Sequence, residues 1–342
     1  MGNSAVFSVV ISTCNRRRYL KDLLDSLAKQ EYKNFEIIVV DGGSTDGTKE
    51  LIERYSVSLP IEFIVQNEPG VYQAWNIGLK NANGEFISYI DDDVIVSPKW
   101  LKSLSESFSL SEKIAGVSGP TIIPKERIKN RDFILFVSGQ KLNPIMRLVG
   151  KIYVSVVLEG RALDVGRIFR SGMFSPGSNF PRSLSLGTID VDYVEACNMT
   201  YRKSLIEKLG GFNGTVYNQE WSEDELCFRI RRLGYKLIFN SEAAVQHLVS
   251  PAGGADRMDA YGRSLDFIHF YFRNVRPDSI DKSLRFSLAV LFWVGYWFYK
   301  SFKSKKLIWL TGIVGLIKGI IEHSKCTQNK SLSNETSKRQ HT

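Results

Sequence analysis

The stretch EFISYIDDDV, residues 85–94, decides the architecture, because an apolar strand pattern runs directly into three aspartates. Residues 85–90 have the β-branched and aromatic character of a buried strand. Three adjacent carboxylates repel one another and raise one another's pKa. A divalent cation with oxygen ligands removes this repulsion, whereas capping of a helix that starts near Pro98 accounts for one aspartate but poorly for three. The sequence therefore favours a metal site within Asp91–Asp93.

Three further strand patterns precede this one, and helical patterns separate them. The strands are expected at residues 7–12, 36–40 and 61–65, and the helices at residues 19–30, 48–55 and 71–81. This alternation predicts an α/β fold with a mostly parallel sheet and helices on both faces. Ligands of such sheets collect beyond the carboxyl ends of the strands. Three of the four strands end there in polar candidates, namely Ser12 with Thr13, Asp41, and Asp91–Asp93.

The later part of the chain offers further acidic and histidine candidates. Residues 125–190 show no clear period, and we expect a variable loop region over the site. A helix pattern then opens with Glu223 and Asp224. Acids in a first turn favour the helix dipole, but one of them could also serve as a general base. His247 ends a short strand pattern, where it is either a structural residue or a metal ligand.

Composition identifies an ordinary globular chain of 342 residues, 43% of them apolar and 24% charged. These proportions exclude collagen-like, disulfide-scaffold and disordered classes. The four cysteines lie far apart with no CxxC pair, which excludes a zinc-ligand spacing and favours a reducing compartment. We also expect no secretory signal peptide at the N-terminus.

The net charge of +9 is concentrated in the last quarter of the chain. Residues 256–342 hold 15 Lys and Arg against 7 Asp and Glu, while the preceding 255 residues hold 30 against 29. A nucleic-acid partner is therefore not expected, because the excess is local. The same quarter holds two apolar runs, Phe286–Tyr299 and Leu307–Ile321, with the basic stretch KSFKSKK between them. Apolar runs with clustered lysines indicate an anionic membrane surface.

The way in which these runs meet the membrane stays open at this stage. Each has about 15 residues, fewer than the roughly 20 that a spanning helix needs. In-plane or re-entrant helices are favoured, a short spanning hairpin comes second, and core helices of a soluble domain are the alternative. Trp293, Trp297 and Trp309 with flanking lysines favour an interfacial position. The polar residues 325–342 are expected to form a disordered tail.

Several ordered motifs together resemble family-2 glycosyltransferases, which have the GT-A fold. The stretches VVISTCNRRRYLKDLLDSL, IIVVDGGSTDGT and GVYQAWNIGLKNANGEFISYIDDDV are similar to the nucleotide-sugar-binding half of that family. The later EACNMTYRKSLIEKLGGFN and SEDELCFRIRRLGYKLIFNSEAAVQH are similar to its acceptor half. The resemblance implies a catalytic domain over residues 1–255, divided near residue 124, then a basic membrane-associating region over residues 256–324 and the tail.

For the donor, the resemblance implies a set of contacts at the strand ends. Ser12 and Thr13 border the nucleobase pocket, and Asp41 binds the base. The helix at residues 71–81 lacks an arginine that some members direct at the diphosphate. Asn76 or the metal would then stabilise the diphosphate.

For the chemistry, the resemblance implies a metal site and a base. Asp91 and Asp93 fall on the DxD motif, with Asp93 the direct ligand of Mn²⁺ or Mg²⁺, and His247 falls where some GT-A enzymes have a further ligand. Asp224 matches the general base that deprotonates the acceptor hydroxyl, and Glu223 supports acceptor binding.

The expected function is therefore metal-dependent, inverting transfer of a sugar to a hydroxyl group. The donor would be a UDP-, GDP- or dTDP-linked sugar. The acceptor would be a lipid-linked glycan at the cytoplasmic face of the cell membrane, in cell-surface polysaccharide or glycoprotein glycan assembly. The alternatives are a nucleotidyltransferase and a non-catalytic glycan- or lipid-binding module. A Rossmann dehydrogenase is disfavoured, because no G-x-G-x-x-G follows the first strand.

Overall fold

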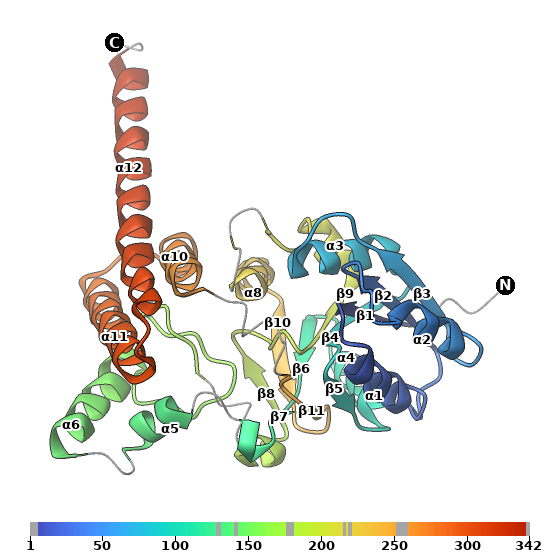
Figure 1. Cartoon of the computed structure of the whole chain (residues 1–342). Coiled ribbons are helices and arrows are strands. Elements are labelled where there is room, and N and C mark those ends of the chain that lie inside the picture. Colours follow the sequence, from blue (N-terminus) through green and yellow to red (C-terminus); the bar gives the residue numbers. More distant parts are fainter. Residues whose placement is uncertain are drawn as a thin grey trace.

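The computed structural model describes residues 6–127, 131–139, 143–175, 181–214, 217, 221–250 and 259–339. An eight-stranded sheet forms its centre, with helices on both faces and a helical region at one side (Figure 1). In sheet order the strands are β3 (Ile61–Val65), β2 (Phe35–Asp41), β1 (Phe7–Thr13), β4 (Phe86–Asp91), β9 (Asn198–Arg202), β6 (Ile114–Ser118), β10 (Lys236–Asn240) and β8 (Thr188–Val191). The first four strands pair in parallel, as the sequence predicts. β9 runs antiparallel to β4 and β6, and β8 antiparallel to β10.

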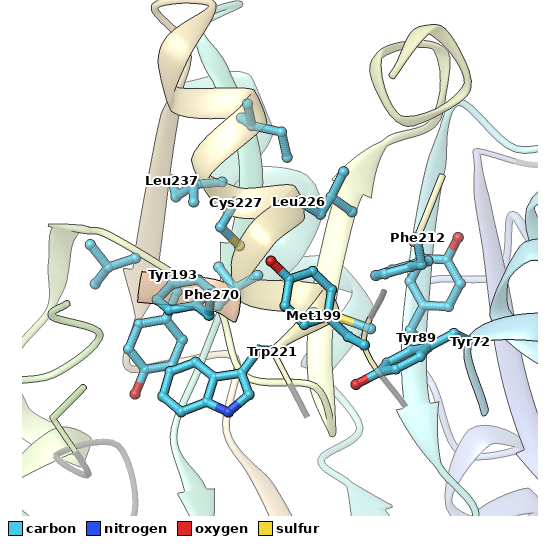
Figure 2. Close-up of a cluster of buried hydrophobic side chains, with 14 of the residues drawn as sticks. Tyr72, Tyr89, Tyr193, Met199, Phe212, Trp221, Leu226, Cys227, Leu237 and Phe270 are labelled. Atoms are coloured by element: carbon cyan, nitrogen blue, oxygen red, sulfur yellow. The ribbon is translucent and has the colours of Figure 1, made fainter. Parts of the chain in front are cut away.

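Helices from residues 17–232 cover both faces of the sheet, because successive strand residues point to opposite faces. Val9 and Ile11 of β1 pack in one apolar core with the leucines of α1, whereas Val10 belongs to the other core with Trp75 of α3. Figure 2 shows part of this second core, in which Phe212 and Leu226 also lie. The helices here are α1 (Arg17–Leu27), α2 (Thr48–Tyr55), α3 (Val71–Asn81), α4 (Trp100–Ser109), α7 (Lys203–Lys208) and α8 (Ser222–Arg232).

A second, three-stranded sheet joins segments that are far apart in sequence. β11 (Val245–His247) pairs antiparallel with β5 (Val94–Val96) and parallel with β7 (Thr121–Ile122). In this register His247 lies opposite Val94. The backbone N–H of Leu248 also donates to the carbonyl oxygen of Asp93 at 2.8 Å. This small sheet therefore brings His247 beside the aspartates that follow β4.

Residues 125–190, for which the sequence predicts a variable loop region over the site, contain several helical elements. They form α5 (Arg131–Ser138), α6 (Pro144–Ile152) and a π-helical turn at Tyr153–Val157, with short 3₁₀ turns at Lys125–Arg127 and Pro181–Ser185. The ring centroids of Tyr153 and Phe292 are 4.5 Å apart, and Arg285 of α11 donates a hydrogen bond to the carbonyl oxygen of Val156. The prediction of a loop region over the site is therefore wrong for α5 and α6, which lie beside the C-terminal helices (Figure 1). Burial of aromatic side chains against a distant helix orders a segment that has no clear period of its own.

The C-terminal region is a packed group of helices rather than two isolated apolar runs. It contains α10 (Ala260–Phe270), a π-helical turn at Tyr271–Val275, α11 (Ile280–Ser304), a 3₁₀ turn at Leu307–Leu310 and α12 (Thr311–Arg339). The indole of Trp297 is 1% exposed and donates to Ser264 of α10 at 2.8 Å. Trp293 stacks on Phe267 and Trp309 stacks on Trp297. The expected interfacial position is therefore wrong for Trp297, because the indoles contribute to helix packing.

Both C-terminal helices are longer than the apolar runs from which they were predicted. α12 continues to Arg339, where the sequence analysis expects a disordered tail from residue 325, and residues 340–342 lie outside the described part. Residues 325–339 contain no Gly or Pro, so this stretch has no strong helix-stopping residue. Within the described residues, the segment Leu307–Lys325 is long and apolar enough to cross a membrane by length and composition, and 22% of it is buried.

Gly315 provides a test of the packing between α12 and α10. A Cβ atom at this position would lie 2.3 Å from the backbone oxygen of Tyr261. We expect Gly315→Ala to lower the free energy of unfolding by about 1–3 kcal/mol, because the helices must separate. Gly295→Ala on α11 is the matched control, since no atom lies within 4 Å of its Cβ position. Chemical denaturation measures both; equal stability of the two variants would contradict this packing.

Candidate functional site

An acidic cluster stands where β4 ends. Asp91 is the last residue of β4, Asp93 lies in the turn between β4 and β5, and β11 supplies His247. The Nε2 atom of His247 lies 3.1 Å from Oδ1 of Asp93 and 3.8 Å from Oδ2 of Asp91. One ligand atom from each of the three residues lies within 4.8 Å of the others. Two carboxylates and an imidazole are a donor set that suits Mn²⁺, and carboxylates suit Mg²⁺. The three residues predicted as metal ligands are thus brought together.

Arg16 neutralises part of this cluster, and the sequence analysis missed it. Its two terminal nitrogens lie 2.7 Å from Oδ1 of Asp92 and 2.5 Å from Oδ2 of Asp93. Asp92 also accepts a hydrogen bond from the hydroxyl of Thr13 at 2.7 Å. Thr13 is predicted to border a nucleobase, but its hydroxyl group donates a hydrogen bond to Asp92. The run of arginines at residues 16–18, directly after the first strand, was the available signal for Arg16.

Burial and neighbouring charges shift the pKa values of the three aspartates in different directions. Burial raises the pKa of Asp91, and burial also raises the pKa of Asp92 to about 7 despite the attraction of Arg16. For Asp93, burial works in the same direction, but the hydrogen bond and charge of His247 hold its pKa well below the usual range. For His247, burial opposes the charged form, yet the bond to Asp93 raises the pKa of the imidazole to about 11. The carboxylate of Asp93 is therefore the strongly anionic group of the cluster.

Glu195 is a second residue that the sequence analysis did not single out. It lies just before β9, and its backbone N–H donates to the hydroxyl of Ser118. Burial raises the pKa of its carboxyl group to about 7, while Thr121 and His247 oppose this shift. The EACN stretch at residues 195–198 was its only sequence signal.

Asp41 is held by its own loop. One carboxylate oxygen accepts from the backbone N–H groups of Gly43 and Ser44, and the other accepts from the hydroxyl of Ser44. These contacts stabilise the turn after β2. Binding of a nucleobase by Asp41 stays a prediction, as it does for Ser12, which is half-buried within β1 beside Thr13.

Asn76 has a structural partner on another element. Its side-chain amide donates to the carbonyl oxygen of Phe212 at 2.9 Å and accepts from the N–H of the same residue at 2.9 Å. This pairing ties α3 to the segment after α7. A cavity of about 490 Å³ adjoins it, lined in part by Gln73, Asn76 and Gly211. Stabilisation of a diphosphate by Asn76 stays a prediction, and its amide is already engaged with backbone groups.

The second acidic group opens α8. Trp221 precedes it in a left-handed conformation with φ of 80°, which is strained for a residue with a bulky side chain. Asp224 is buried, and Oε2 of Glu223 accepts from the hydroxyl of Tyr72 on α3 at 3.3 Å. Glu225 differs from both, because it forms an ion pair with Arg229 at 2.8 Å. The three acids of this turn therefore have different surroundings, and the acceptor roles of Glu223 and Asp224 stay predictions.

Residues 8–210 match the family model described as glycosyl transferase family 2. Poly(ribitol-phosphate) beta-N-acetylglucosaminyltransferase TarS of Staphylococcus aureus is 36% identical over 123 residues, which cover 33% of this chain and 22% of that protein. Hyaluronan synthase of Pasteurella multocida is 26% identical over 280 residues, or 79% of this chain and 28% of that protein. The chain thus matches less than a third of either relative's length.

Two solved structures show the same fold. Mannosyltransferase PcManGT from Pyrobaculum calidifontis, in complex with GDP-Man and Mn²⁺, matches with a TM-score of 0.56 at 17% identity, covering 93% of this chain and 88% of that chain. S. aureus TarS 1–349 in complex with UDP matches with a TM-score of 0.51 at 17% identity, covering 86% and 72%. At this identity the likeness concerns the fold alone.

Proposed function

Since this chain belongs to glycosyl transferase family 2 and is a glycosyltransferase with the GT-A fold, we propose that it transfers a sugar from a nucleotide-sugar to a glycan hydroxyl with inversion. The single observation that carries the proposal is the meeting of Asp91, Asp93 and His247 at the edge of the sheet where such donors bind. Membership of the family favours this reading over a nucleotidyltransferase and over a non-catalytic binding module.

The donor half of the proposal concerns the diphosphate. Asp91, Asp93 and His247 would hold a divalent cation, either Mn²⁺ or Mg²⁺. Such a cation supplies charge neutralisation to a leaving diphosphate. Arg16 orients Asp92 and Asp93 through its two terminal nitrogens, and Ser250 donates its backbone N–H to Asp93 at 2.7 Å. These contacts support the proposal because they hold the carboxylate of Asp93 in one orientation.

The acceptor half concerns the start of α8. Direct displacement with inversion requires one base, and no second carboxylate nucleophile is needed. We assign Asp224 as this base and Glu223 as the group that binds the acceptor beside Tyr72. Asp224 is buried in the first turn of α8, where the positive end of the helix dipole attracts negative charge.

A ligand screen tests the proposal as a whole. UDP-, GDP- and dTDP-sugars are added to the full chain with and without Mn²⁺, and the unfolding temperature is measured. A ligand that binds the folded state raises this temperature. We expect one nucleotide to stabilise the chain only with metal. The absence of metal-dependent stabilisation by any of the three would count against the proposal.

We further propose that the acceptor is lipid-linked and that the enzyme lies on the cytoplasmic face of a membrane. Large apolar side chains are exposed on one face of α11, at positions seven, seven and four residues apart: Leu284, Leu291, Phe298 and Phe302. α6 exposes Ile145, Leu148 and Ile152 in the same way. The lysines at residues 300–306 and the excess positive charge of this quarter support contact with anionic headgroups.

Membrane contact predicts a specific loss on substitution. In the full chain, Leu291→Gln combined with Phe298→Gln and Phe302→Gln should greatly reduce flotation with vesicles containing anionic lipid, because the apolar contribution to binding is removed. Val57→Gln is the control, since Val57 is 90% exposed and follows α2 in the catalytic half. Unchanged flotation of the triple variant would show that this face of α11 does not contact the membrane.

A further inference from the structure

A cavity of about 640 Å³ lies at the end of α8 opposite to the proposed base. It is open to solvent and is lined by four parts of the chain, namely the C-terminal end of α8, the segment around Ile168–Arg170, Asp192 after β8, and the segment that joins α10 to the first turn of α11. Five cationic and two acidic side chains line it, so the lining carries a net charge of +3. The charged residues are Arg170, Arg231, Arg232, Arg276, Lys282, Asp192 and Asp278.

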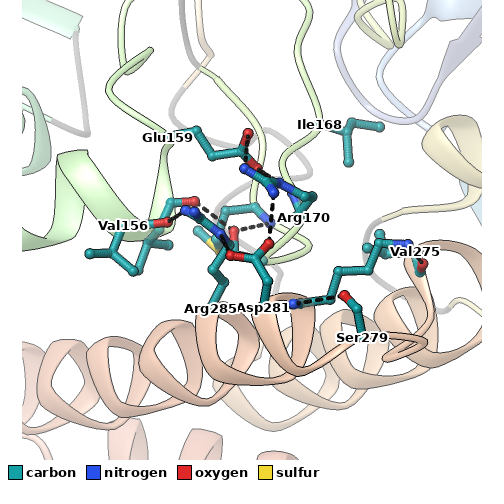
Figure 3. A network of polar contacts seen from close by, with 12 residues as sticks. Val156, Glu159, Ile168, Arg170, Val275, Ser279, Asp281 and Arg285 are labelled. Carbon is teal, nitrogen blue, oxygen red and sulfur yellow. Dashed lines mark hydrogen bonds and ion pairs between the residues drawn. The ribbon is translucent and has the colours of Figure 1, made fainter.

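Most of these cations are held in place by neighbouring groups. Figure 3 shows Arg170 between Glu159 and Asp281, with Nη1 of Arg170 at 2.7 Å from Asp281. Arg231 lies 2.9 Å from Asp192, and Lys282 lies 2.9 Å from Asp278. Arg232 donates to the carbonyl oxygens at the end of the π-helical turn. The cavity wall is therefore pre-organised, which lowers the entropic cost of binding a ligand.

Arg276 is the exception, and its backbone is unusual. It has φ of 62° and precedes Pro277, in a region of backbone space that non-glycine residues rarely adopt. Its side chain is exposed, and its Nε–H donates a long hydrogen bond of 3.4 Å to the carbonyl oxygen of Arg273. Strain of this kind is retained where the surrounding structure holds a residue for a purpose. Arg276 thus presents a guanidinium to the cavity at a cost in backbone energy.

The face of α8 connects this cavity with the proposed base. Asp224, Phe228 and Arg231 are four and three residues apart, so they lie along one side of the helix. At 1.5 Å per residue, Asp224 and Arg231 are about 10 Å apart along the axis. Phe228, half-buried between them, also lines the cavity. Phe228 also packs against the ring of Phe270 on α10, with 5.5 Å between the ring centroids, and the cavity lies about two helical turns from Asp224.

We propose that this cavity binds a phosphate ester of the acceptor, whose reacting hydroxyl then has to span the distance of about 10 Å along the axis of α8 to Asp224. A guanidinium group can form two parallel hydrogen bonds to a phosphate group. Arginine stands at four of the five cationic positions of the lining, which suits a phosphate ligand. This inference rests on the proposed function, because it identifies the class of acceptor for that reaction. The phosphate belongs either to a lipid diphosphate or to a phosphodiester within a glycan.

The first test measures phosphate binding without transfer. Calorimetry follows inorganic diphosphate binding to the full chain at fixed ionic strength with EDTA. We expect Arg276→Gln and Arg231→Gln together to weaken binding about tenfold or more, the scale of lost hydrogen bonds to a charged ligand. Arg276→Gln alone should weaken binding without a change in unfolding temperature, because the exposed side chain forms a single long hydrogen bond among the described residues. Arg54→Gln, an exposed arginine on α2, controls for the loss of one positive charge.

The outcomes separate this inference from the proposed function. Asp93→Asn should bind diphosphate as the unaltered chain does, since Asp93 belongs to the metal cluster and not to this cavity. Equal affinity in the unaltered chain and the double variant, or equal loss in Arg54→Gln, would overturn the inference even if transfer is confirmed. With an active donor and acceptor, the cavity variants should raise the KM for the acceptor and leave the KM for the donor unchanged.

A final comparison identifies the source of the phosphate. Vesicles containing a polyprenyl diphosphate and a soluble glycerol-phosphate oligomer are tested with the unaltered chain and with Arg276→Gln. The ligand whose binding depends on Arg276 is the class of acceptor. If neither ligand shows this dependence, the inference is wrong.

Discussion

Asp93→Asn is expected to abolish metal-dependent donor binding and nearly all sugar transfer. The substitution keeps the shape of the side chain but removes the charge that His247 and Arg16 surround. Loss of a bound cation removes several kcal/mol of stabilisation from the leaving diphosphate. The measurements are donor binding by calorimetry, with Mn²⁺ and with EDTA, and transfer of labelled sugar.

Asp92→Asn is the matched control for this prediction. Asp92 lies beside Asp93 and contacts the same arginine, but it is not part of the Asp91–Asp93–His247 cluster. We expect it to retain most of the metal-dependent donor binding. Donor binding that is equally tight with EDTA, in the unaltered chain and in Asp93→Asn, would exclude the metal role.

Asp224→Asn has the second large expected effect. It should reduce turnover by roughly 10²-fold or more, the usual scale for losing a general base, while donor affinity stays nearly unchanged. The reason is that Asp224 stands on α8, whereas the predicted donor contacts stand on β1, β2, α3 and β4. Steady-state kinetics and donor calorimetry on the same preparation measure the two quantities.

Glu225→Gln separates the base from helix capping. Glu225 stands in the same first turn, but its carboxylate is paired with Arg229. Both substitutions remove one negative charge that favours the helix dipole. If the two variants lose stability and activity in parallel, the acids at the start of α8 serve the helix and not the reaction.

Side-chain periodicity predicted several helices and strands with correct bounds, because the formation of a helix or strand depends largely on residues that are near neighbours in sequence. The bounds predicted for Thr48–Tyr55, Ile61–Val65 and Val71–Asn81 are those that the structure has. The parallel pairing of the first four strands is also confirmed, since strand and helix alternate at βαβ spacing. Asp91, Asp93 and His247 were named from their positions at the ends of apolar strand patterns.

The features that the sequence patterns did not predict depend on contacts between residues that are far apart in sequence. The pairing of β11 with β5 places His247 at Asp93, and no pattern within either segment specifies that register. Arg16 reaches Asp92 and Asp93 only because β1 lies beside β4. α5 and the π-helical turn that follows α6 pack against Phe292 of α11, so the order of this segment depends on contacts that its own sequence signals only weakly.

The sequence by itself therefore determined the class of fold, the order of its elements and the residue types at the end of each strand. These follow from side-chain periodicity, which is a property of consecutive residues. Only the tertiary structure decided which side chains share one site, that Trp297 is buried within the helices, and that the cationic wall lies about 10 Å along α8 from Asp224. Those features depend on contacts between residues that are distant in sequence, and the free energy of such contacts is realised only when the whole chain packs.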